Sequence, residues 1–289
     1  MSAGRPDEVA SPPRSRVREL STYLRDLGPA GALDRVVAAR IDSTNLLARR
    51  AVAAYLAEEG EPPAFLVLAL EQSAGRGRQG RAWSSPAGRG VYATRVLAVR
   101  SHEELRTLPL LVAVGLAVGL DDLIGSGRCR LKWPNDLLVG GRKIGGILIE
   151  AMPLGPRAWI ALAGFGVNHA PAAVSGWPEG ATSLAEEAGG GAPLPPLGEV
   201  ARRLLAAVEA ELGHLGETAY AGQAYRDLSA HRTGDRLRCR TGDGVLAGTV
   251  LGFDDGGLLR LEVDGREVLL GAAEVVEDNG RPHPGGDAE

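Results

Sequence analysis

An arginine- and glycine-rich segment is the first place where residue types and spacing could do chemistry. It reads Gly75-Arg76-Gly77-Arg78-Gln79-Gly80-Arg81 and formally matches GxGxxG. A dinucleotide-binding fingerprint also needs an acidic residue about 20 positions further on, but neither Asp nor Glu occurs between Gln72 and His102. A Walker loop needs Lys and then Ser or Thr after its last glycine, where this chain has Arg81-Ala82. Both patterns are excluded, and the kinase pattern fails because its later catalytic motifs are missing.

The charge of this segment points to an anionic ligand. The stretch between Gln72 and His102 contains no acid, in a chain of net charge −4, and it contains the arginines Arg76, Arg78, Arg81, Arg89, Arg95 and Arg100. Guanidinium groups bind phosphate oxygens through paired hydrogen bonds, and glycines let the backbone approach a ligand closely. We therefore predict that the segment binds a nucleoside triphosphate or an acyl adenylate. The alternatives are a solvated loop and an RNA-binding Arg-Gly tract, but such tracts run longer, whereas this one lies between two apolar runs.

Two lysines mark a second segment. All other basic residues are arginines, and the lysines are Lys132, in Lys132-Trp133-Pro134-Asn135-Asp136, and Lys143, which opens Lys143-Ile144-Gly145-Gly146. A lysine supplies a compact point charge on a flexible stem. Two such cations beside a carboxylate and small residues favour charge neutralisation around a reacting carboxylate and phosphate. A hairpin with capped turns is the alternative interpretation.

A third segment, Gly164-Phe165-Gly166-Val167-Asn168, ends a predicted strand. Its small residues leave room for a ligand, and Asn168 could contact a metal ion bound to phosphate. Cys129 and Cys239 stand alone, and no His/Cys cluster has metal-ligand spacing, so we expect no transition-metal site. No Ser/His/Asp or Cys/His constellation is evident either, which favours catalysis without a covalent protein intermediate.

The elements that position these segments are read from the hydrophobic pattern. Helices are predicted at 17–27, from the N-cap run 42–45 to about residue 60, and at 105–124, 197–215 and 220–228. Strands are predicted at 34–41, 65–70, 90–99, 130–132, 137–139, 144–151 and 158–167, and then, with short Gly/Asp turns, at 235–240, 245–253, 258–263 and 267–270. This succession predicts an α+β fold with a mixed sheet covered by helices, followed by a small antiparallel barrel.

Composition limits the function classes. The chain has 289 residues, 44% of them hydrophobic, which suits a globular protein with a substantial core. The net charge of −4 argues against a general nucleic-acid binder. The most apolar stretch, 108–120, is shorter than the roughly 20 residues that span a bilayer, and no signal peptide is evident. We therefore expect no membrane association and a cytoplasmic location.

Taken together, the motifs resemble those of one family, the biotin protein ligases. The resemblance extends from about Ile41 to Val276. It rests on Ser43-Thr44-Asn45, Gln72 with GRGRQGRAW, KWPND, RKIGGILIE, GFGVN and Ala181-Thr182-Ser183-Leu184, in that order. Lipoate ligases have a similar fold but lack this combination of motifs.

The resemblance implies a fold and a domain organisation. The fold would be that of class II aminoacyl-tRNA synthetases and biotin synthetases, with a C-terminal SH3-like barrel. The implied parts are a leader with a short helix (1–32), a catalytic domain (33–230), the barrel (231–278) and a disordered tail (279–289). A winged helix-turn-helix, as in bifunctional members, would need roughly 60 residues before the first strand. About 33 precede it, which implies a monofunctional ligase that binds no DNA and is a monomer or weak homodimer.

The resemblance also implies a reaction in two steps. Biotin and ATP would form biotinyl-5′-AMP and pyrophosphate. The biotin would then pass to a lysine of the biotin carboxyl carrier domain of an acyl-CoA or pyruvate carboxylase, with release of AMP. The alternatives are a non-enzymatic regulator that senses biotinyl-adenylate and a lipoate-type ligase of the same fold.

Residue roles follow from the same resemblance. The implied biotin-binding residues are Ser43, Thr44, Asn45, Gln72, Gly75, Arg76, Gly77, Arg78, Trp83, Lys143 and Gly146. The implied ATP-binding residues are Arg78, Arg81, Trp83, Lys132, Asn135, Lys143 and Asn168. The implied catalytic residues are Arg76, Arg78, Lys132, Asp136 and Lys143, with Mg²⁺ as the metal, near Asn168 and Asp136. Asp136 could equally orient the incoming lysine amine.

Overall fold

A computed structural model describes most of the chain. The described residues are 34–58, 60–170, 178–188, 194–271, 273–278 and 281–282. The expected leader and its helix at 17–27 lie outside them. So does most of the expected disordered tail.

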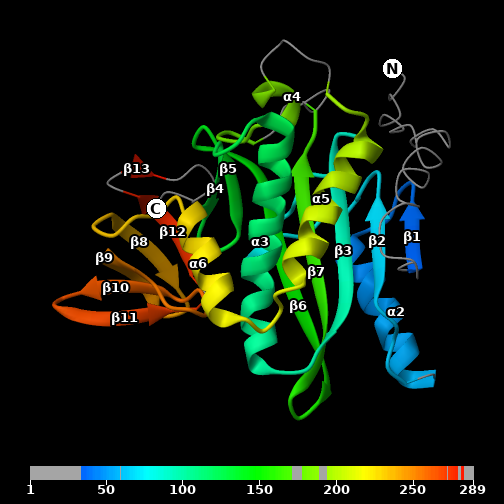
Figure 1. Cartoon of the computed structure of the whole chain (residues 1–289), viewed down its shortest axis with the longest axis horizontal. Helices are drawn as coiled ribbons and strands as arrows, with labels where there is room; N and C mark the ends of the chain where they lie inside the picture. Colours follow the sequence, from blue (N-terminus) through cyan, green and yellow to red (C-terminus); the bar gives the residue numbers. More distant parts are fainter. Residues whose placement is uncertain are drawn as a thin grey trace, which may run out of the picture.

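A seven-stranded sheet forms the centre of the larger part of the molecule (Figure 1). Its strand order is β1-β2-β3-β7-β6-β5-β4. In chain order the strands are β1 (Asp34–Ala38), β2 (Phe65–Ala69), β3 (Gly90–Val99), β4 (Cys129–Lys132), β5 (Asp136–Val139), β6 (Arg142–Gly155) and β7 (Ala158–Asn168). The β1–β2 pair is parallel and every other neighbouring pair is antiparallel. The expected mixed sheet is therefore confirmed.

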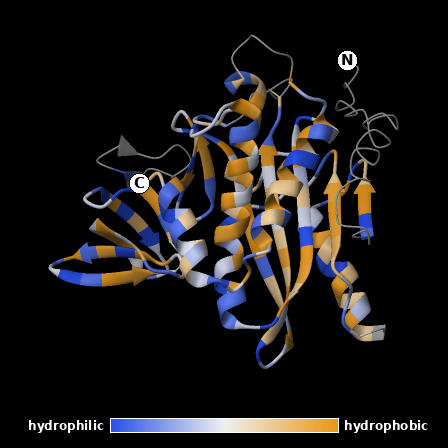
Figure 2. Ribbon diagram, viewed as in Figure 1, coloured by the Kyte–Doolittle hydropathy of each residue, from blue (hydrophilic) through white to orange (hydrophobic). Residues whose placement is uncertain are grey.

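Helices cover both faces of this sheet because its strands are apolar on both sides. In β2, Leu66 and Leu68 pack into a core with the long helices α3 (His102–Ile124) and α5 (Leu197–Leu212). Their neighbours Phe65 and Val67 point to the opposite face, where they pack against α2 (Thr44–Glu58). Figure 2 shows the resulting hydrophobic strands between the helices. The remaining helices are α4 (Leu184–Glu187) and α6 (Thr218–Leu228).

The central helix α3 begins earlier than the apolar pattern predicts. Ser101 caps it, since its side chain accepts a hydrogen bond of 3.1 Å from the Glu104 N–H. By length and composition α3 could span a membrane, but 67% of its most apolar window is buried inside the protein. Gly115 allows α5 to approach closely, because a Cβ there would lie 2.6 Å from Val208 Cα. The apolarity of α3 is thus accounted for by its position in the core.

The C-terminal residues form a second, six-stranded antiparallel sheet with the order β11-β10-β9-β8-β12-β13. The strands are β8 (Arg236–Thr241), β9 (Gly244–Phe253), β10 (Leu259–Val263), β11 (Arg266–Leu270), β12 (Glu274–Asp278) and β13 (Arg281–Pro282). The four predicted strands are present. The pattern missed β12, and β13 lies inside the segment expected to be a disordered tail, so that expectation is wrong for its first described residues.

The second sheet packs against the larger part and shares its hydrophobic core. Trp133, in the KWPND segment, donates its indole N–H to the Gly257 carbonyl at 3.1 Å. Arg106 on α3 pairs with Asp254 at 3.0 Å. These contacts place the second sheet beside the end of β4, where the KWPND segment begins.

Candidate active site

A cavity of about 290 Å³ lies where the arginine-rich segment, the KWPND turn and the second sheet meet. Each residue that the sequence analysis assigned to the site lines this cavity, except Gly75. Segments that are far apart in sequence thus supply one site.

The arginine-rich segment folds as a hairpin with a short 3₁₀ turn (Arg78–Gly80) at its tip. Gly77 N–H donates to the Arg81 carbonyl at 2.8 Å, and Trp83 N–H donates to the Gly75 carbonyl at 2.9 Å. A Cβ at Gly75 would lie 2.4 Å from the Trp83 carbonyl oxygen, so glycine is needed there for the close approach of the two arms. Gly75 therefore shapes the hairpin rather than the cavity wall.

The arginines of this segment differ in their surroundings. Arg76 pairs with Glu150 at 3.4 Å, and Arg81 pairs with Glu274 on β12. Burial lowers the pKa of Arg78, and the nearby carboxylate of Asp136 opposes that effect. The hairpin is thus tied to β6 and to the second sheet, with Arg78 between them.

Three arginines of the same positive stretch lie outside the cavity, namely Arg89, Arg95 and Arg100. Arg95 pairs with Glu209 on α5 at 2.7 Å, and Arg100 pairs with Glu61. The acids that balance them come from other parts of the chain. The anion-binding potential is therefore concentrated in Arg76, Arg78 and Arg81.

A glutamine side chain at one end of the cavity is held in one orientation. The Gln72 Oε1 atom accepts a hydrogen bond of 2.8 Å from the Thr44 N–H and one of 3.2 Å from the Thr44 hydroxyl. Its Nε2 atom donates to Ser85 Oγ at 2.7 Å. Ser43 and Thr44 are buried where α2 begins. This cluster presents amide and hydroxyl groups to an otherwise enclosed space.

Asn45 is occupied by bonds within the protein. Its Nδ2 atom donates to Glu150 Oε2 at 2.8 Å and to the Leu148 carbonyl at 3.3 Å, and its Oδ1 atom accepts from the Thr94 hydroxyl at 2.6 Å. The amide therefore connects α2 to the sheet. Its place in the cavity wall is set by these contacts.

Lys143 lies at the centre of the site. Its Nζ atom is 2.6 Å from Asp136 Oδ1 and 5.3 Å from the centre of the Trp83 ring. Trp83 lies against two glycines: a Cβ at Gly166 would be 2.4 Å from its Nε1 atom, and one at Gly146 would be 3.3 Å from its Cζ3 atom. The small residues of two motifs thus make room for a tryptophan beside the Lys143 ammonium group.

The other polar residues of the site are more enclosed. Lys132 is buried, and this burial lowers its pKa, although nearby Asp136 acts in the opposite direction. Asn135 donates through Nδ2 to the Ile147 carbonyl at 2.8 Å, which fixes the KWPND turn to β6. Asn168 donates through Nδ2 to the Thr182 carbonyl at 2.8 Å, while its buried Oδ1 has no hydrogen-bond partner among the described residues. Asn168 as a residue also lines the cavity.

Several lining residues were missed by the sequence analysis. Glu274 and Val275 of the second sheet and the preceding Ala273 line the cavity, as do residues 178–180. Neither group carries a recognisable chemical pattern. Glu150 bonds to Asn45 and pairs with Arg76. It is the last residue of the RKIGGILIE motif, so the motif could have pointed to it.

Potential metal ligands also converge outside the cavity. Ligand atoms of His231, Asp235 and Asp278 lie within 4.8 Å of one another. His231 Nδ1 is 3.4 Å from Asp278 Oδ2, a contact that also makes a simple His–Asp pair. Their separation along the chain hid this cluster from the spacing analysis.

Comparison with known proteins decides the family. Residues 37–168 match the model of the "Biotin/lipoate A/B protein ligase family". A biotin--[acetyl-CoA-carboxylase] ligase of Paracoccus denitrificans is 36% identical over 247 residues, which are 82% of this chain and 98% of the relative. The chain belongs to the biotin protein ligase family. A biotin--[acetyl-CoA-carboxylase] ligase of Mycobacterium tuberculosis is 33% identical and shares 83% of this chain and 87% of its own length.

The fold of this biotin protein ligase family member agrees with solved structures. A biotin protein ligase from Aquifex aeolicus in complex with biotin and ATP is similar with a TM-score of 0.64 and 24% identity, over 83% of this chain and 97% of that chain. The resemblance inferred from the motifs is therefore confirmed.

Proposed function

We propose that the cavity binds biotin and ATP, joins them as biotinyl-5′-AMP and transfers the biotin to a lysine of a biotin carboxyl carrier protein. As a member of its family, the chain is an ATP-dependent biotin ligase. The observation that supports the assignment of this activity to the cavity is the convergence of the arginine hairpin, Lys143 and the Gln72–Thr44 pair around one enclosed space. These groups match, respectively, phosphates, a carboxylate and a polar ring.

The proposed reaction exchanges bonds in two steps. A carboxylate oxygen of biotin attacks the α-phosphorus of ATP, and the bond from that phosphorus to pyrophosphate breaks. The carrier lysine amine then attacks the acyl carbon, the bond from that carbon to AMP breaks, and the amine loses a proton. Lys143 is positioned to stabilise the carboxylate and the negative charge that develops on phosphate oxygens. Because an acyl adenylate hydrolyses in water, closure by the arginine hairpin would protect it.

We assign the polar ring of biotin to the Gln72 end of the cavity. Ser43, Thr44 and Gln72 supply hydroxyl and amide groups of the kind that satisfy a ureido ring. Trp83 and Ile147 would flank the apolar part of biotin. Asn45 would act through the shape of the wall, because its amide is already engaged by Glu150, Leu148 and Thr94.

We assign ATP to the side of Arg78, Lys132 and Asn168. Arg78 and Arg81 would bind phosphates from the hairpin, and Lys132 would contribute a buried positive charge. Asn135 would serve mainly by fixing its turn, since its Nδ2 is bonded to the Ile147 carbonyl. Arg81 pairs with Glu274 here, so a phosphate would compete with that carboxylate.

The residues that line the cavity provide few oxygen ligands for a Mg²⁺ ion. Asp136 is paired with Lys143 through Oδ1, so it would approach Mg²⁺, or orient the carrier amine, once Lys143 turns to a substrate. Asn168 Oδ1 remains as one neutral oxygen. Mg²⁺ keeps most of its ligands as water and substrate phosphate oxygens, and we propose that it enters with ATP and screens its phosphates.

Further assignments belong to the same proposal. Residues 33–230 would form the catalytic domain, and the second sheet, within 231–278, would be an SH3-like domain that helps to cover ATP or receive the carrier. The carrier domain of an acyl-CoA or pyruvate carboxylase would be the partner. We propose neither a DNA-binding nor a membrane-bound role, and we propose a monomer or weak homodimer.

Intact mass spectrometry tests the activity. The purified chain is incubated with biotin, MgATP and an apo carrier domain, and the expected result is a gain of one biotin on the carrier. A carrier whose acceptor lysine is replaced by arginine is the control. Tight adenylate binding without transfer would support the regulator instead, and transfer of lipoate in place of biotin would support the lipoate-type ligase.

A further inference from the structure

Thr182 connects two residues of the site. It is fully buried, and its N–H donates to the Lys143 carbonyl at 2.8 Å. Its own carbonyl accepts the 2.8 Å hydrogen bond from Asn168 Nδ2. The Lys143 N–H in turn donates to the Gly180 carbonyl at 2.8 Å. One residue therefore sets both the backbone position of Lys143 and the direction of the Asn168 amide, whose free Oδ1 lies in the cavity wall.

The side chain of Thr182 is held by carboxylates of α4. Its Oγ1 atom lies 2.8 Å from Glu187 Oε1 and 2.9 Å from Glu186 Oε2. A hydroxyl has one proton to donate, so it serves one carboxylate at a time. The Glu187 side chain is 8% exposed and that of Glu186 is 33% exposed. The bond to Glu187 is better shielded from water, and it is the stronger of the two.

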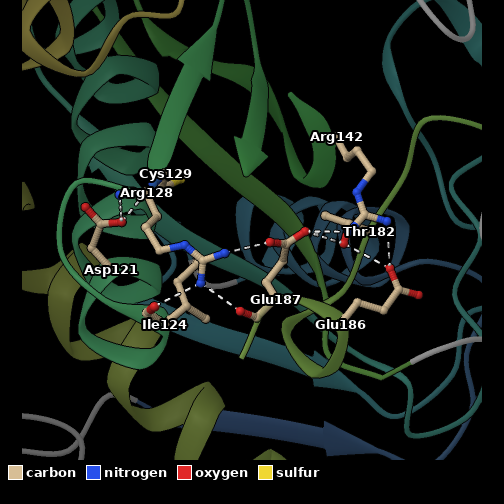
Figure 3. Close-up of polar contacts among 8 residues, drawn as sticks. All are labelled: Asp121, Ile124, Arg128, Cys129, Arg142, Thr182, Glu186 and Glu187. Atoms are coloured by element: carbon tan, nitrogen blue, oxygen red, sulfur yellow. Dashed lines mark hydrogen bonds and ion pairs between the residues drawn. The ribbon is translucent and has the colours of Figure 1, made fainter. Parts of the chain in front are cut away.

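Two arginines hold Glu187 in place. Figure 3 shows its carboxylate between Arg128 and Arg142, whose guanidinium nitrogens lie 2.8 and 2.7 Å from Oε2 and Oε1. A buried carboxylate needs such compensation to stay charged. The backbone N–H of Arg128 is itself bonded to Asp121 of α3 at 3.1 Å. Arg142 directly precedes Lys143. The chain of contacts through Arg142, Glu187 and Arg128 therefore connects the neighbour of Lys143 to the core helix α3.

We propose that Thr182 and Glu187 are positioning residues for adenylate formation, an inference that rests on the proposed function. They hold Asn168 and Lys143 in the positions needed to contact the phosphates of ATP and the carboxylate of biotin. Thr182 and Glu187 themselves touch neither substrate. A displacement of about 1 Å at a reacting group can cost a large part of the rate. The biotin ring end is built by Thr44 and Gln72 on other segments. Loss of the Thr182 anchor should thus impair adenylate formation much more than biotin binding, which would lose only part of its contact with Lys143.

Thr182→Val tests this proposal, because it removes the hydroxyl at nearly constant volume. We expect the kcat of biotinyl-5′-AMP formation to fall about tenfold, while the Kd of biotin, measured by calorimetry, changes much less, because the Gln72–Thr44 pair is not linked to Thr182. Thr182→Ser retains the hydroxyl and should restore most of the rate. Thr182→Ala, which leaves room for a water beside Glu187, replaces Thr182→Val if the latter does not fold, with the same expected loss.

Thr107→Val is the matched control. Thr107 is equally buried, and its hydroxyl donates to the Glu103 carbonyl at 2.9 Å, but it lies outside the cavity. This variant should lose thermal stability without a change in kcat. If Thr182→Val behaves in the same way, with only its Tm lowered, the proposal is overturned and the proposed function stands. If the wild-type chain itself forms no adenylate, the proposed function fails and this proposal fails with it.

Discussion

Lys143 and Asp136 form an ion pair across the β5–β6 hairpin, with 2.6 Å between Nζ and Oδ1. The Lys143 side chain is 36% exposed, so its ammonium can exchange this partner for a substrate carboxylate or phosphate. The pair thus presents a charge that is oriented before the substrate arrives.

Lys143→Ala should reduce the rate of biotinyl-5′-AMP formation by about 10²–10³-fold, because one preorganised charge contact is lost. Pyrophosphate release measures the rate, and circular dichroism should show an unchanged fold. Lys143→Arg keeps the charge but not the compact ammonium, and it should recover only part of the rate. A near-normal rate for Lys143→Ala would refute the role assigned to this residue.

Arg78→Ala should release biotinyl-5′-AMP faster. A charge-assisted hydrogen bond contributes about 1.5–3 kcal/mol, so the dissociation rate should rise roughly tenfold to a hundredfold, as measured by stopped-flow fluorescence. Arg100→Ala makes the same change of charge outside the cavity, where Arg100 pairs with Glu61, and it should leave the rate unaltered. Equal dissociation rates for both variants would contradict closure by the arginine hairpin.

Gly166→Ala should weaken biotin binding and destabilise the fold. The added methyl group would lie 2.4 Å from Trp83 Nε1, so the indole must move from its place in the cavity wall. Overpacking of this kind costs about 1–3 kcal/mol of unfolding free energy, measurable by urea denaturation, and the KM for biotin should rise. Gly155→Ala, where a Cβ meets nothing within 4 Å, is the control. Wild-type values for both variants would show that Trp83 adapts freely.

The rate of adenylate formation should fall at alkaline pH. Burial lowers the pKa of Lys132 from its ordinary value of 10.5, so its positive charge is lost as pH rises through that lowered pKa. The phosphates then lose an attractive partner. Lys132→Arg keeps its charge to higher pH, so the alkaline limb of its pH–rate profile should move upward. An unchanged alkaline limb would mean that another group titrates there.

The local pattern was sufficient to predict most elements and the chemistry of the motifs. Apolar runs predicted the strands of the mixed sheet, and the N-cap residues before α2 marked its start. The charge of the arginine-rich segment predicted an anion site, because clustered guanidinium groups without neighbouring acids attract anions. Boundaries were less accurate: β6 extends to Gly155, well beyond the predicted residue 151.

The tertiary structure decided which distant groups meet. Glu274 reaches the arginine hairpin only because the second sheet packs beside the KWPND turn, and Glu187 reaches Arg128, 59 residues away in sequence, only because α4 packs beside α3. Neither acid belongs to a motif named in the sequence analysis. Hydrophobic period and motif spacing report on neighbours along one element, whereas these contacts depend on how whole elements pack. The amino-acid sequence by itself therefore determined the family and proposed the reacting groups, and the packing of distant elements determined which side chains surround them.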